Sequence, residues 1–194
     1  ELAVLEKIKV ALESGQLANT VALDAEKELP LVAHHNLLTM KPILYVVNVD
    51  ESATPGATQH LIPGSVQISA KIEAELSELP EEDAKVMMQE LGMKQTGLQK
   101  LITACYELLN LQSFLTTGED ETRAWTIKRG TKAPQAAGVI HTDFEAKFIR
   151  AEVIAWDKLL AAGIWSAARD KGWLRMEGKN YVMQDGDVVE IHHS

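Results

Sequence analysis

The chain has 194 residues, which is enough for one or two domains with hydrophobic cores of their own. Apolar residues make up 46% of it, charged residues make up 24%, and no run of about 18 apolar residues or secretory signal pattern is present, so we expect a soluble, cytoplasmic protein with no membrane partner. The formal net charge of −9 argues against a protein that coats nucleic acid through bulk positive charge.

The charge is unevenly distributed along the chain. Residues 1–111 carry 8 basic and 16 acidic side chains, whereas residues 112–194 carry 11 basic and 12 acidic ones. Any contact with RNA is therefore expected from the C-terminal half. The single cysteine, Cys105, excludes an intrachain disulfide, and its place on an apolar helical stripe favours a buried structural thiol over a nucleophile.

Helical patterns open the chain. Apolar residues recur at helical spacing at Leu2, Leu5, Ile8 and Leu12. Gly15 is a suitable stop, and Asp24 is placed to cap a second helix that Pro30 would shorten or kink. Because the sequence begins inside the first pattern without a methionine, we expect an excerpt of a longer protein.

Two short strands follow, each with polar residues at its end. Residues 43–47 form an apolar run that predicts a strand buried on both faces of a parallel sheet, and Asn48 to Glu51 follow it directly. A second strand at residues 65–68 leads into Ser69, Ala70 and Lys71 and then a helix. Because ligands of such sheets bind beyond the carboxyl ends of the strands, both polar segments are candidates for a site.

Two further helices are predicted before the pattern changes. Acidic residues at 81–83 suit the first turn of one helix, which Gly92 can end, and Thr96 can cap the next. After Asn110 the pattern becomes that of a small α+β unit. Its predicted elements are a hairpin at 112–128, a helix starting at Pro134, an alternating strand at 148–154 with Ile149 facing inward and Glu152 outward, and a hairpin at 181–191 around Asp185-Gly186.

Specific motifs carry a resemblance to a known family. The segments Asn48-Val49-Asp50-Glu51 and Ser69-Ala70-Lys71 resemble the two base-recognition loops of P-loop GTPases. Residues 123–144 read RAWTIKRGTKAPQAAGVIHTDF. Together with residues 148–154 and Asp185-Gly186-Asp187, they are similar to the TGS domain of Obg-like ATPases of the YchF group.

The resemblance implies an α/β portion of a P-loop NTPase followed by an α+β TGS domain with a ubiquitin-like β-grasp fold. Residues 1–38 would be the remnant of a helical insertion and its return, residues 39–111 the C-terminal part of the nucleotide domain with connecting helices, and residues 112–194 the TGS domain. ATP or GTP with Mg²⁺ would be the cofactors, although no Mg²⁺ ligand is expected in this chain. Ribosome and RNA binding and a role in translation or stress regulation are also implied.

The base-recognition loops lead to a prediction of nucleotide preference. By analogy, Asn48 would brace the loops and contact the base, the Val49 carbonyl would accept from an adenine amine, and residues 69–71 would line the other side. In guanine-specific relatives an Asn-Lys-x-Asp loop offers a carboxylate that accepts two hydrogen bonds from guanine. Here Val49 stands at the Lys position and the longer Glu51 at the Asp position. Adenine presents one donor and one acceptor on that edge, so we expect the guanine preference to weaken and ATP to be preferred.

The phosphate side of such a site has no counterpart in the sequence. No G-x-x-x-x-G-K-[ST] loop occurs, and phosphoryl transfer needs one to hold the phosphates and Mg²⁺. We therefore expect the chain alone to be inactive, with no catalytic residue of its own. Sixteen residues separate Asn48 from Ser65, which is tight for a crossover helix, so the connection at 49–64 is either short or incomplete.

A basic cluster is the candidate contact with RNA or the ribosome. It consists of Lys128, Arg129 and Lys132, beside the helix predicted at Pro134. The alternative is a solvated strand edge protected by charge. For the base loops, the corresponding alternatives are a loop-capping role for Asn48 and a solvated Lys71.

The two other functional classes are a metal site and a binding module without nucleotide hydrolysis. His34 with His35, and His141 with Asp143, lack the spacing of a structural zinc site, so no metal site is expected. A binding or regulatory module without nucleotide hydrolysis is the alternative function, because TGS domains also occur in threonyl-tRNA synthetases and stringent-response enzymes.

Overall fold

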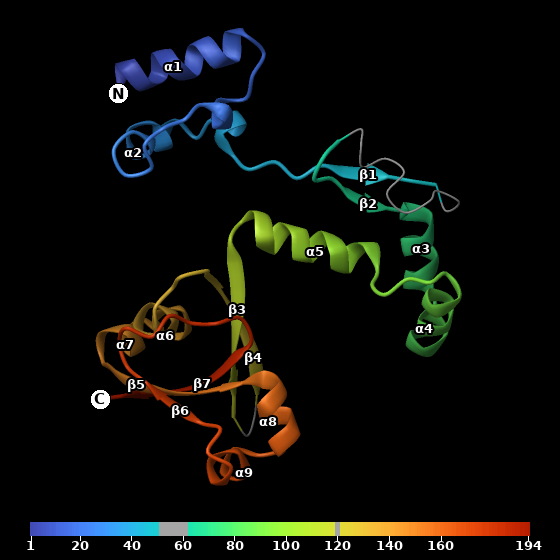
Figure 1. The fold of residues 1–194 in the computed structure, drawn as a ribbon, viewed down its shortest axis with the longest axis vertical. Coiled ribbons are helices and arrows are strands. Elements are labelled where there is room, and N and C mark those ends of the chain that lie inside the picture. The colour runs from blue at the N-terminus through green and yellow to red at the C-terminus, as the bar shows by residue number, and fades with distance from the viewer. Residues whose placement is uncertain (51–61, 119–120) are drawn as a thin grey trace. The chain divides into compact units, whose positions relative to one another are not determined.

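The structure, a computed structural model, describes residues 1–50, 62–118 and 121–194. The chain divides into two compact units, Glu1–Ala104 and Cys105–Ser194, and helix α5 (Gly97–Leu108) contributes residues to both (Figure 1). Within the described ranges, no helix combines the length and the apolar character needed to cross a lipid bilayer. The three-part division at residues 38 and 111 stays a prediction.

A small helical cluster opens the first unit. Helix α1 (Leu2–Glu13) buries Val4, Ile8 and Ala11, which are spaced at i, i+4 and i+7 and therefore share one face. Leu2, from the predicted stripe, is instead 72% exposed. The predicted stop is correct, because Gly15 has a φ of 75° just beyond the helix. Short helices complete the cluster: Ala18–Thr20, α2 (Leu29–Val32), Ala33–His35 and Leu38–Met40.

The predicted cap at Asp24 belongs to a turn and not to a helix. Its Oδ1 accepts hydrogen bonds from the backbone N–H groups of Glu26 and Lys27, both at 2.9 Å. Helix α2 begins only at Leu29, with Pro30 in its first turn. Proline fits there because the first helical N–H groups have no partner within the helix.

A two-stranded parallel sheet and three helices form the rest of the unit. Strand β1 (Val46–Asn48) pairs with β2 (Val66–Ile68), and helices α3 (Ala70–Glu78), α4 (Glu81–Glu90) and α5 follow. The parallel pairing is as predicted, but the buried strand at 43–47 is wrong: β1 is shorter, and Val46 is 48% exposed. In the described residues β1 pairs only with β2, and both Val46 and Asn48 are exposed, unlike the residues of a strand that is buried on both faces.

The second unit is built on a five-stranded sheet in the order β4-β3-β7-β5-β6. Its strands are β3 (Leu111–Thr117), β4 (Thr122–Lys128), β5 (Phe148–Ala155), β6 (Arg175–Glu177) and β7 (Asp187–His193). β3 and β7 run parallel in the middle, and the other pairs are antiparallel. Helix α6 (Ala133–Ile140) has the predicted proline, Pro134, in its first turn, and α7 (Thr142–Ala146) follows it. This is the predicted α+β, β-grasp arrangement.

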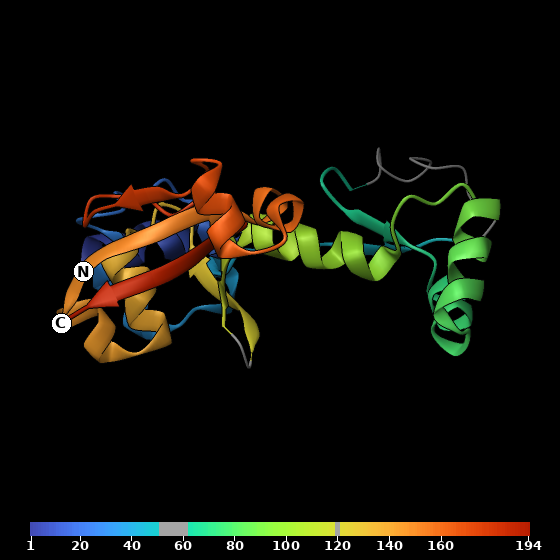
Figure 2. The same cartoon turned by 90° about the horizontal axis from the view of Figure 1, so that it is seen from below.

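Helices cover both faces of the central strands. On one face Val153 and Val189 pack with Phe114 and with alanines of α6. On the other, Ile154 and Val188 pack with residues of α8 (Trp156–Ala162) and α9 (Trp165–Asp170), two helices that the sequence analysis did not predict (Figure 2). Because both faces of β5 are covered, simple inward–outward alternation cannot describe it.

The predicted orientation of β5 is accordingly wrong at two positions. Phe148 is 3% exposed and Ile149 is 53% exposed, because a register shift between Phe148 and Arg150 rotates the start of the strand. Glu152, predicted to face solvent, is 7% exposed and lies beneath α9. Its Oε2 accepts a hydrogen bond from the Arg169 side chain at 2.8 Å.

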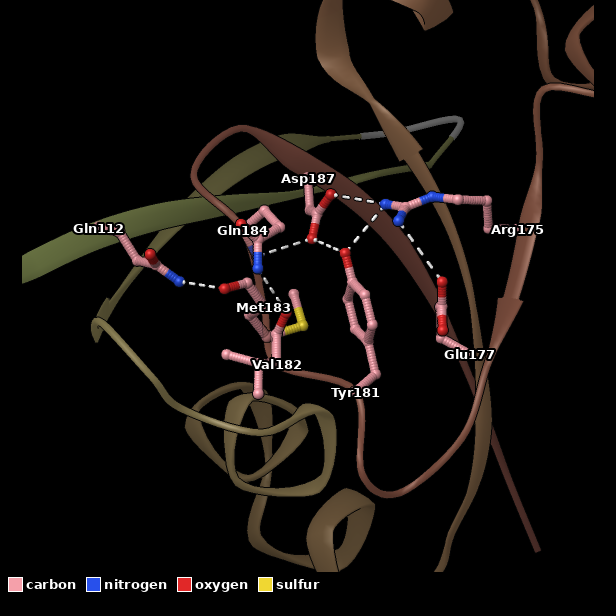
Figure 3. Close-up of polar contacts among 8 residues, drawn as sticks. All are labelled: Gln112, Arg175, Glu177, Tyr181, Val182, Met183, Gln184 and Asp187. Carbon is pink, nitrogen blue, oxygen red and sulfur yellow. Dashed lines mark hydrogen bonds and ion pairs between the residues drawn. The ribbon is translucent and has the colours of Figure 1, made fainter.

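The hairpin predicted at 181–191 is not formed. The Asp185-Gly186 turn exists, with a Gly186 φ of 78°, but Val182 bridges to Lys132 instead of pairing with β7. Polar side chains hold this segment, as Figure 3 shows. The buried Asp187 carboxylate accepts from the Tyr181 hydroxyl at 2.7 Å, the Gln184 N–H at 2.8 Å and the Arg175 guanidinium at 3.2 Å.

Candidate functional site

The two candidate base loops leave the same end of adjoining strands. β1 and β2 are parallel, with Val46 opposite Val66 and Asn48 opposite Ile68, and the Val49 N–H donates to the Ile68 carbonyl at 2.9 Å. Residues 48–50 and 69–71 therefore follow neighbouring strand ends (Figure 1). This is the edge at which ligands of parallel sheets bind.

Asn48 ties the two loops together directly. Its side-chain Oδ1 accepts a hydrogen bond from the Ala70 N–H at 3.0 Å, across 22 positions of sequence. That bond occupies the carbonyl oxygen and leaves the side-chain NH₂ group to donate to another partner. Asn48 is exposed and Val49 is half-buried, so the segment lies at the surface of the unit.

Ser69, Ala70 and Lys71 form the start of α3. The Ser69 hydroxyl is the N-cap of this helix and accepts from the Ile72 N–H at 3.5 Å, so it has a structural role whatever else it contacts. Ala70 and Lys71 are exposed in the first turn. Glu51, the fourth residue of the other loop, lies outside the described residues.

A mostly apolar cavity of about 350 Å³ lies beside the loops, lined by residues that include Val46, Asn48, Ile68 and Ala70. Glu73, which no motif in the sequence marks, also lines this cavity. The Glu73 carboxylate accepts from the backbone N–H groups of Gly97 at 2.6 Å and Leu98 at 3.1 Å.

This contact anchors the N-terminus of α5 beside the first turn of α3. A carboxylate suits that position because the N–H groups there have no partner within the helix. Thr96 also forms the predicted cap, with its Oγ1 accepting from the Gln99 N–H at 3.1 Å. Gly97 and Glu73 are 24 positions apart, so no local sequence signal could link them.

The candidate basic surface belongs to the second unit. Lys128 ends β4, Arg129 lies in the following turn and Lys132 precedes α6, and all three are exposed. The turn holds them together, because the Arg129 N–H donates to the Asn110 carbonyl at 2.8 Å and Gly130 adopts a φ of 86°. Among the described residues, none of the three side chains forms an ion pair.

Comparison with known proteins identifies the family. The model YchF-GTPase_C, described as "Protein of unknown function (DUF933)", matches residues 111–194. The chain is 45% identical over 203 residues to the Ribosome-binding ATPase YchF of Bacillus subtilis, an alignment that covers 98% of this chain and 55% of that protein. It belongs to the YchF group of Obg-like ATPases.

Other YchF-type relatives and structures agree. Obg-like ATPase 1 of Rattus norvegicus is 41% identical over 177 residues, covering 84% of this chain and 44% of that protein. The structure of the Schizosaccharomyces pombe YchF GTPase matches with a TM-score of 0.80 at 34% identity, over 98% of this chain and 53% of that one. The chain thus spans about half the length of these relatives. The predicted resemblance and fold class are both confirmed.

Proposed function

We propose that this chain is part of a ribosome-associated P-loop NTPase of the YchF type, to which it contributes the loops around the purine base and the TGS unit. The observation that carries the proposal is the bond from the Ala70 N–H to Asn48 Oδ1, which joins two loops at the ends of neighbouring parallel strands. The name of the bacterial relatives, ribosome-binding ATPase, supports it. A role in translation or stress regulation, in the cytoplasm, follows from ribosome association.

Within this proposal, Asn48, Val49, Glu51 and residues 69–71 surround the base. Because Asn48 Oδ1 is already used, its NH₂ group is the part that donates to a ring nitrogen of the purine. Val49, where guanine-specific loops have lysine, supplies its backbone carbonyl to the adenine amine. ATP is therefore preferred over GTP.

The phosphates and Mg²⁺ need groups that this sequence does not contain. It has no G-x-x-x-x-G-K-[ST] loop to hold a triphosphate and its metal. The two loops of this chain would therefore contact only the purine base. We expect the 194-residue chain to release no phosphate from ATP, and hydrolysis to require a protein that also carries such a loop.

Nucleotide titration of the full-length protein tests this function. We expect ATP to bind more tightly than GTP, and Asn48→Ala to weaken ATP binding about twofold to tenfold, which corresponds to the loss of about one hydrogen bond. Asn19→Ala is the matched control, because the Asn19 side chain also bonds the backbone, donating its NH₂ group to the Lys41 carbonyl at 3.2 Å, but lies outside both loops. GTP binding at least tenfold tighter than ATP, a gap of about 1.4 kcal/mol, would contradict the proposal.

The basic surface of Lys128, Arg129 and Lys132 is the proposed contact with ribosomal RNA. Its three exposed cations share one turn and have no acidic partner among the described residues, so they remain available to phosphates. Reversing all three charges should reduce cosedimentation of the full-length protein with ribosomes. Reversing Lys147, Lys158 and Lys179, which are also exposed and in the same unit, should reduce it less; equal effects would reject this surface.

A further inference from the structure

Two carboxylates and an imidazole meet on the face of the sheet that α8 and α9 cover. Glu152 of β5 lies directly opposite Glu190 of β7, and His192 follows Glu190 by two positions, so the three side chains share one face. Like charges directly opposite each other in an antiparallel pair are destabilising. This arrangement therefore needs a positive partner.

Arg169 meets only part of that need. Its guanidinium donates to Glu152 Oε2 at 2.8 Å, and this bond raises the pKa of Arg169. The Arg169 side chain is 60% exposed, whereas that of Glu152 is 10% exposed. Arg169 also attracts Glu190 through its charge, but its hydrogen bond reaches only one oxygen of Glu152, so the other oxygen of Glu152 and both oxygens of Glu190 accept no hydrogen bond among the described residues.

The distance between His192 and Glu152 is informative. His192 Nε2 lies 3.6 Å from Glu152 Oε1, which is too long for a hydrogen bond. This nitrogen is buried and has no hydrogen-bond partner in the described part of the chain, although a third of the side chain is exposed. Two ligand atoms on one tetrahedral Zn²⁺, with bonds of about 2.1 Å, lie roughly 3.4 Å apart.

We propose that Glu152, Glu190 and His192 bind a divalent transition-metal ion of the Zn²⁺ class. One ligand atom from each residue lies within 4.8 Å of the other two, so small side-chain movements bring all three to one ion. Imidazole together with carboxylates suits Zn²⁺, whereas Mg²⁺ prefers oxygen ligands alone. The site is thus chemically different from the Mg²⁺ site of an NTPase, and the bound ion would fasten β5 to β7.

Calorimetric titration of the 194-residue chain with Zn²⁺ tests the proposal. All samples carry His34→Ala and His35→Ala, because these histidines and Glu1 form a second, exposed group that could also take a metal. We expect one ion per chain, and at least a tenfold loss of affinity with His192→Gln. His193→Gln is the matched control and should bind as tightly as the unchanged chain.

Arg169→Gln separates a metal site from a purely structural ion-pair cluster. In a metal site, removing the guanidinium removes a positive charge beside the ion, so the Zn²⁺ affinity should rise. In a purely structural ion-pair cluster, the same change would lower the thermal stability, and Zn²⁺ would have no effect on the variant. If His192→Gln does not fold, as judged by circular dichroism, Glu190→Gln on the exposed residue should give the same tenfold loss. Binding weaker than about 100 μM, or equal binding by His192→Gln and His193→Gln, would overturn the proposal.

Discussion

Replacing Asp187 with alanine should strongly destabilise the second unit. The Asp187 carboxylate is 3% exposed and accepts from Tyr181, Gln184 and Arg175 (Figure 3). Alanine would leave the first two donors without this acceptor. Removing one partner from a buried charged network costs about 3–5 kcal/mol. The Arg175 side chain is 47% exposed, so its ion pair adds little, and we expect a loss near the lower end of that range.

Asp185→Ala is the matched control for this prediction. Asp185 is exposed and accepts one backbone hydrogen bond, from the Ser113 N–H at 2.8 Å, so its loss should cost about 1 kcal/mol. Urea denaturation followed by tryptophan fluorescence measures both variants, because every tryptophan of the chain lies in the second unit: Trp125, Trp156, Trp165 and Trp173. A loss for Asp187→Ala no larger than that for Asp185→Ala would refute the reasoning.

Three further predictions concern pH and glycine positions. Burial, followed by the bond to Asp187, raises the pKa of Tyr181 from 10.0 to about 12. The contribution of Tyr181 to the unfolding free energy is therefore fully present below pH 10 and is lost as the pH rises towards 12. Urea titrations at several pH values should show that Tyr181→Phe removes this loss of stability between about pH 10 and 12. Gly186→Ala should lower the unfolding free energy more than Gly130→Ala, as measured by urea denaturation with tryptophan fluorescence. Both glycines have a positive φ, but only a Cβ at Gly186 would meet another side chain, that of Trp156 at 2.5 Å. Equal losses would refute this contact. The added methyl group of Gly97→Ala would overlap the Ile68 side chain and should lower the stability of the first unit by about 1–3 kcal/mol. This loss should appear as faster amide hydrogen exchange in β2 and α3, and unchanged exchange would count against the contact.

Local signals in the sequence predicted much of the fold. Hydrophobic spacing, the Thr96 cap and the glycines at 15 and 92 located helices, and the strand pattern at 112–128 located the hairpin of β3 and β4. The errors arose where tertiary contacts override periodicity. β5 is covered on both faces, and the segment before β7 is held by a side-chain network instead of a strand ladder.

The candidate site was predictable only in part, for the same reason. The order of strand, polar loop, strand and polar loop predicted that residues 48–50 and 69–71 follow adjoining parallel strands, and the pairing of β1 with β2 confirms that topology. The contact of Glu73 with the start of α5 and the grouping of Glu152 with His192 join residues far apart in sequence. Such contacts depend on the folded backbone and leave no spacing motif.

Photolabelling tests most directly whether the two loops hold a purine. The full-length protein would be irradiated with 8-azido-ATP, with and without excess ATP, and the labelled peptides mapped by mass spectrometry. We predict ATP-protected labelling within or beside residues 48–51 or 69–71, reduced by Asn48→Ala. ATP-protected labelling confined to residues 105–194 would contradict the account.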